Sequence, residues 1–105
     1  MNDKYFYENV ISACEIMDYE KSKWNPPPWP IPDSDRIYAI KKQIAIDELK
    51  KYLFDRAADA PVNVLIEDFV HENRYNAALY PRDTQARELF STLANTAEDM
   101  SIFFL

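Results

Sequence analysis

The chain has 105 residues, and none of them is glycine. Glycine adopts positive φ without steric cost, and tight hairpin turns and phosphate-binding loops depend on such positions. The absence of glycine therefore excludes a P-loop, the glycine fingerprint of dinucleotide-binding folds and a nucleophile elbow of the usual kind. Connections between elements must use proline, asparagine or aspartate, which favours helices joined by stiff links over a meander of strands.

Size and composition predict one globular domain covering residues 1–105. Hydrophobic residues make up 48% of the chain and charged residues 29%, unlike the composition of disordered chains. Cys14 is the only cysteine, which excludes an intramolecular disulfide, and the first residues lack the basic and apolar segments of an export signal. The longest purely apolar stretch, residues 102–105, is far shorter than the roughly 20 residues of a membrane-spanning helix. We expect a cytoplasmic protein that does not bind membranes.

Apolar residues recur at spacings of three and four along most of the chain, which is the pattern of helices with one buried face. The pattern predicts an all-α, four-helix bundle-like fold, with helices at about residues 3–23, 34–58, 61–79 and 82–104. We expect Pro61 in the first turn of the third helix, where an amide donor is not needed. The apolar stripe of the second helix consists of Ile37, Ile40, Ile44, Ala45, Leu49, Tyr52 and Leu53.

The fourth helix carries a heptad seam of the kind that joins helices. Its residues are spaced alternately by four and three: Ala86, Phe90, Leu93, Ala97, Met100 and Phe104. More apolar surface lies beside the seam than one intramolecular face can easily cover, at Leu89, Ile102, Phe103 and Leu105. We therefore expect this helix to mediate self-association as a homodimer. The alternative is that residues 102–105 fold back onto the first and third helices within a monomer.

Residues 24–32 form a proline-rich connector between the first two helices, with the sequence Trp-Asn-Pro-Pro-Pro-Trp-Pro-Ile-Pro. Each proline removes an amide donor and restricts the preceding residue to extended conformations, so we expect polyproline II. At about 3.1 Å per residue the connector can span roughly 28 Å, which is the length of a 20-residue helix. The second helix is therefore free to run parallel to the first, an option that a short loop would forbid.

The connector has two interpretations. It is either a strap whose Trp24 and Trp29 cover apolar surface between helices, or a docking ligand for a module that recognises polyproline through Pro27 and Pro28. No basic residue stands in the usual flanking register of such ligands, so we favour the strap.

Charge is distributed unevenly along the chain, whose net charge is −6. Residues 1–20 carry one positive and five negative charges, residues 21–58 eight and five, and residues 59–105 three and eight. We interpret this as a basic helix between acidic neighbours whose potentials partly cancel, the alternative being a basic patch for an acidic partner. The net negative charge repels phosphate backbones, so we expect no nucleic-acid binding.

Three groups of side chains are candidates for chemistry. His71 lies four residues after Glu67, so both share one helix face. A catalytic zinc usually has three protein ligands, and we interpret this pair as part of a solvated acidic face. Cys14 falls within the apolar stripe of the first helix, where cysteine is most often a small buried hydrophobe.

A third group, Glu15 and Asp18, resembles one carboxylate unit of the all-α nucleotide pyrophosphohydrolases, in which two such units on facing helices hold magnesium. The resemblance implies a metal-dependent hydrolase that uses the carboxylates of the first helix. The adjacent pairs at residues 67–68 and 98–99 splay about 100° apart and do not reproduce the second unit.

Taken together, these patterns favour a small non-catalytic interaction or regulatory accessory protein that associates with itself or with another protein. The pyrophosphohydrolase is the alternative enzyme hypothesis, and an acidic decoy for a nucleic-acid-binding partner is a third. We assign no catalytic residue, no metal ligand and no cofactor. The candidate interaction residues are Trp24, Pro27, Pro28, Trp29, Phe90, Leu93, Met100, Phe103, Phe104 and Leu105.

The strap interpretation makes a prediction about fluorescence. Trp24 and Trp29 should both be largely buried in the folded chain, because two indoles left in water would forgo several kcal/mol of burial. Tryptophan emission should therefore be blue-shifted relative to the denatured chain. An equally red-shifted maximum in both states would instead support the docking ligand.

Overall fold

The computed structural model describes residues 3–23, 30 and 32–104, with side chains from residue 8 onward. No strand occurs within these ranges, and the helices pack against one another, which confirms the predicted all-α, four-helix bundle-like fold. The elements are α1 (Asp3–Ser22), α2 (Asp33–Asp55), α3 (Val62–Ala78), α4 (Gln85–Ser101) and a short 3-10 helix, η1 (Ile102–Phe104).

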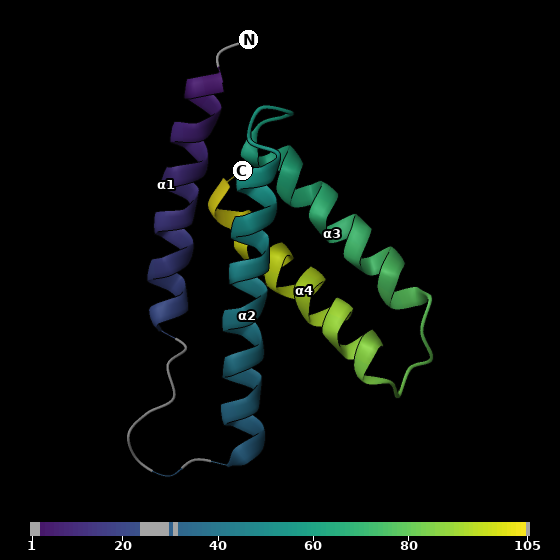
Figure 1. Ribbon diagram of the computed structural model, residues 1–105. Coiled ribbons are helices and arrows are strands. Elements are labelled where there is room, and N and C mark those ends of the chain that lie inside the picture. The colour runs from purple at the N-terminus through teal and green to yellow at the C-terminus, as the bar shows by residue number, and fades with distance from the viewer. Residues whose placement is uncertain (1–2, 24–29, 31, 105) are drawn as a thin grey trace.

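The helices form two antiparallel pairs that cross each other (Figure 1). In the first pair, α1 and α2 run side by side in opposite directions, and in the second, α4 returns along α3. The α3–α4 interface is the most extensive, and α2 packs across α4 to join the pairs. The parallel arrangement of α1 and α2 that a long connector permits is therefore not the one adopted.

Two ion pairs define the register of α1 against α2. Lys21 Nζ lies 2.9 Å from an Asp47 carboxylate oxygen, and Lys50 Nζ lies 2.6 Å from one of Asp18. From the first ion pair to the second, the residue number falls from 21 to 18 in α1 and rises from 47 to 50 in α2, which is the order that antiparallel helices require. Residues near the end of α1 therefore lie beside the middle of α2, and the first half of α2 projects beyond α1 (Figure 1).

The helix starts differ by a few residues from the periodicity-based boundaries. Pro61 is the N-cap of α3, with extended backbone angles, instead of lying in its first turn. α4 starts at Gln85 because Thr84 closes a turn on the Pro81 carbonyl, 3.2 Å from its own amide. The Thr84 hydroxyl oxygen then accepts a hydrogen bond from the Arg87 amide at 3.3 Å, which satisfies one of the free donors at the helix start.

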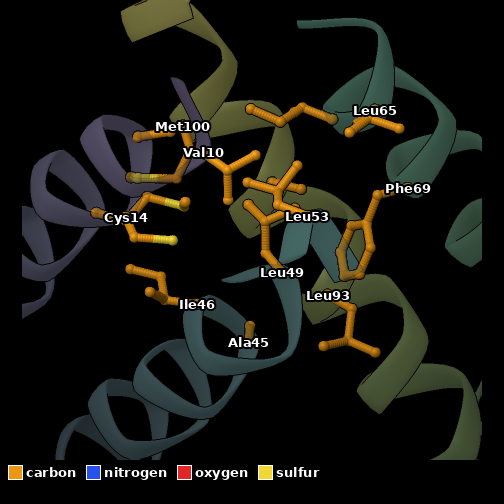
Figure 2. Packing of buried hydrophobic residues seen from close by; sticks show 14 of the residues in the cluster. Val10, Cys14, Ala45, Ile46, Leu49, Leu53, Leu65, Phe69, Leu93 and Met100 are labelled. Carbon is orange, nitrogen blue, oxygen red and sulfur yellow. The ribbon is translucent and has the colours of Figure 1, made fainter. Parts of the chain in front are cut away.

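The core lies where the two pairs cross and draws on all four helices (Figure 2). Sulfur-containing and small side chains of α1 meet branched side chains of α2 and α3, which suits the close approach of helices. The buried members are Val10, Ala13, Cys14, Met17, Ala45, Ile46, Leu49, Leu53, Ala57, Leu65, Ile66, Phe69, Leu93, Ala97 and Met100. Asn73 is buried as well, and its side-chain amide donates to the Phe69 carbonyl at 2.8 Å.

The cap of α4 can be tested by mutation. Thr84→Ala removes the capping hydroxyl and should lower the free energy of unfolding by about 1 kcal/mol, measured by urea denaturation. Thr92→Ala is the matched control, because the Thr92 hydroxyl donates to the Glu88 carbonyl within the helix and caps nothing. Equal losses in the two variants would contradict the capping role.

Candidate functional site

The heptad seam of α4 is largely used by the chain's own core. Leu93 and Met100 are buried, and Phe90 and Phe104 are partly buried against the core cluster. Phe90 also stacks on Tyr80, with ring centroids 5.7 Å apart. Four of the candidate interaction residues therefore contribute to the core of the single chain.

The chain end partly folds back, as the monomer alternative expects. Phe104 lines a hollow with Ala13 and Ile16 of α1 and with Val62 at the start of α3. Phe103 lies against the outer face of α1 and remains 43% exposed, while Ile102 is more exposed still. We call the exposed apolar group formed by Ile16, Tyr19, Ile102 and Phe103 the α1–η1 surface.

A second exposed apolar group lies where α2 projects beyond α1. Three isoleucines of α2 and one leucine of α4 are each about half exposed, and we call them the α2–α4 surface: Ile37, Ile40, Ile44 and Leu89. Ile44 and Leu89 face a groove of about 450 Å³ between the two helices. The Lys41 ammonium and a Glu88 carboxylate oxygen pair across this groove at 2.5 Å.

The apolar spacing of α2 does not distinguish the α2–α4 surface from the core, because it places the exposed isoleucines and the buried leucines in a single stripe. Helix geometry gives the missing signal, because the five-residue step from Ile44 to Leu49 rotates by about 140° around the axis. Leu49 is fully buried and Ile44 is 48% exposed, in agreement with that rotation. The stripe is in fact two faces, one internal and one external.

The remaining candidate interaction residues lie outside the described residues. These are the connector residues Trp24, Pro27, Pro28 and Trp29, together with Leu105. Their assignment stays a prediction from the sequence.

The groups considered for chemistry are separated from one another. His71 Nε2 lies 3.7 Å from a Glu67 oxygen on an exposed face, and Asp18 is hydrogen-bonded to Lys50 instead of facing a second carboxylate unit. Within the part of the chain that the structure describes, no three His, Cys, Asp or Glu side chains converge as metal ligands would. The described contacts of these groups do not join them into one site.

The arginines near the α3–α4 turn are held by the protein itself. Arg74 pairs with Glu98 across α3 and α4, and the Arg87 guanidinium donates to the Tyr80 carbonyl at 3.1 Å. The first contact joins α3 to the C-terminal part of α4, and the second joins the start of α4 to the segment that connects the two helices.

Comparison with known proteins gives no relative from which to transfer a role: no family model, no curated protein and no solved structure matches the chain. Among the described helices, none combines the length and the apolar character needed to cross a membrane. Function must therefore be inferred from the surface of this chain alone.

Burial of Cys14 makes a prediction about thiol reactivity. Desolvation raises the pKa of the Cys14 thiol, with Lys50 opposing and Asp18 adding to the shift. The thiolate, which is the reactive form, is therefore scarcer in the folded than in the unfolded chain. Modification by a thiol reagent at mildly alkaline pH should be slow in the native protein and fast in urea.

The same shift has a defined effect on stability. The pKa of the Cys14 thiol is higher in the folded than in the unfolded chain. Its contribution to the free energy of unfolding is therefore fully present below the ordinary thiol pKa and is lost as pH rises through the folded-state pKa. Rapid native-state labelling would contradict the burial of Cys14.

Proposed function

We propose that this chain is a small non-catalytic protein-interaction domain of the cytoplasm that associates with itself as a homodimer. The observation that carries the proposal is the pair of exposed apolar groups on a bundle whose core is otherwise closed. A single reduced cysteine, buried and without a partner for a disulfide, supports the cytoplasmic location.

The exposed groups differ from ordinary scattered surface residues. Single exposed hydrophobic side chains are normal on proteins, whereas neighbouring ones on adjoining elements mark sites of association. Ile37, Ile40 and Ile44 occupy two successive turns of α2, and Leu89 of α4 lines the same groove as Ile44. On the α1–η1 surface, Phe103 and Ile16 similarly adjoin across two elements.

The energy available from covering these residues is large on the scale of a small domain. Completing the burial of a half-exposed isoleucine or leucine contributes roughly 1 kcal/mol. Four such residues in each protomer would contribute several kcal/mol to a dimer, compared with a net domain stability of about 5 to 15 kcal/mol.

A second copy satisfies this requirement without any other component. Identical patches related by a two-fold axis form a closed assembly, in which each protomer covers the other. The exposed apolar side chains of the folded chain favour a role in binding.

Sedimentation equilibrium tests the proposal directly. The intact chain at tens of micromolar should have the mass of a dimer, and its melting temperature should rise with protein concentration because dimerisation stabilises the folded state. A folded monomer whose melting temperature does not depend on concentration would refute self-association.

A further inference from the structure

One row of side chains on α2 combines apolar and charged residues in a regular order. Arg36, Ile40, Ile44 and Glu48 follow one another at intervals of four residues, so they form a slanted row that covers about 120° of the helix surface, on the side opposite the buried residues. All four are exposed, Ile40 to 44% and Ile44 to 48%. We call these four residues the α2 row.

The charged groups at the two ends of the row have no partner among the described residues: neither the Arg36 guanidinium nor the Glu48 carboxylate makes a hydrogen bond or an ion pair there. Two lysines of the same helix are instead paired within the chain, since Lys50 binds Asp18 and Lys41 binds Glu88. The row therefore presents one positive end, an apolar centre and one negative end to the surroundings.

The register of the helices explains why α1 leaves most of this row uncovered. The contact of Lys21 with Asp47 places the end of α1 beside the middle of α2. Arg36, Ile40 and Ile44 precede that point, and Figure 1 shows this part of α2 projecting beyond α1. α4 approaches from one side only, where Lys41 and Glu88 line the groove.

The row is complementary to a reversed copy of itself. If two α2 helices pair in opposite directions about a two-fold axis that passes between Ile40 and Ile44, each Ile40 lies opposite an Ile44 and each Arg36 opposite a Glu48. A two-fold interface requires this kind of reciprocal match, in which residue i contacts j and j contacts i. Parallel pairing would place Arg36 against Arg36 and is disfavoured by repulsion.

The α1–η1 surface lacks this property. Its hollow is bordered by Ile16, Tyr19 and Phe103 and by two glutamates, of which Glu20 is paired with Lys23 and Glu15 has no ion-pair partner among the described residues. Pairing this surface with its own copy would bring carboxylates of like sign together, at a cost in an interface from which water is excluded.

We propose that two copies of the chain associate through the α2 row, with their α2 helices antiparallel and with Leu89 extending the contact into the α2–α4 groove. This inference rests on the proposed self-association and identifies its surface and its register. The occupant of the exposed face is a second copy of this chain.

A charge swap tests the register. Arg36→Glu and Glu48→Arg, made singly, place like charges opposite each other at two equivalent positions, and each should raise the dimer dissociation constant about tenfold in sedimentation equilibrium at low salt. The double variant carrying both changes reverses the row and should restore the dissociation constant of the intact chain. Circular dichroism should show unchanged helicity in all three, because both positions are exposed.

An apolar substitution and a matched control locate the surface. Ile40→Glu should convert the dimer to a folded monomer, whereas Phe103→Glu, which adds a charge to the α1–η1 surface, should leave it a dimer. A dimer that survives Ile40→Glu and is lost in Phe103→Glu would overturn the α2 row and leave self-association intact.

The other outcomes are equally distinct. Failure of the double charge variant to regain the affinity lost by its single variants would overturn the antiparallel register. A monomeric intact chain would overturn this inference and the proposed function together.

Discussion

The packing of α2 is the constraint on which the rest of the structure depends, because this helix contacts each of the other three. Its second half carries Ile46, Leu49 and Leu53, which are fully buried where the helix pairs cross. Its first half projects past the end of α1 and is covered on one side by α4. One helix therefore provides both the centre of the core and three of the four residues of the α2–α4 surface. The end of α1 marks where one role gives way to the other.

The helices themselves could be predicted because their causes are local. Apolar spacing of three and four, the lack of glycine and the position of Pro61 and Pro81 are all properties of short segments, and they place four helices within a few residues of the observed ones. The direction of α1 against α2 is not local, since it depends on ion pairs between residues far apart in the chain. Lys21 and Asp47 become neighbours only after folding, so the long connector left both directions open.

The candidate site was harder to predict for a related reason. A heptad seam indicates that one face of a helix packs against another surface, but the pattern does not identify that surface. In this chain Leu93 and Met100 pack into the core of the same molecule. For α2 the spacing merged two faces into one stripe, because the stripe includes the consecutive residues Ile44 and Ala45, which lie about 100° apart around the helix. The rotation between Ile44 and Leu49 separates the two faces: Ile44 lies on the exposed face and Leu49 on the buried one.

The alternation of charge along the chain acquires a structural meaning from the same contacts. Lysines of the basic middle segment reach acidic residues in both neighbouring segments: Lys50 reaches Asp18 in α1, and Lys41 reaches Glu88 in α4. The hydrogen bond to Asp18 is the main reason that the pKa of Lys50 is raised, so this ammonium stays charged throughout the neutral range. Such exposed pairs contribute little stability individually, but they select one arrangement of helices over others of similar apolar burial. In the dimer that we propose, Arg36 and Glu48 on the outer face of α2 would select the orientation of the second copy in the same way.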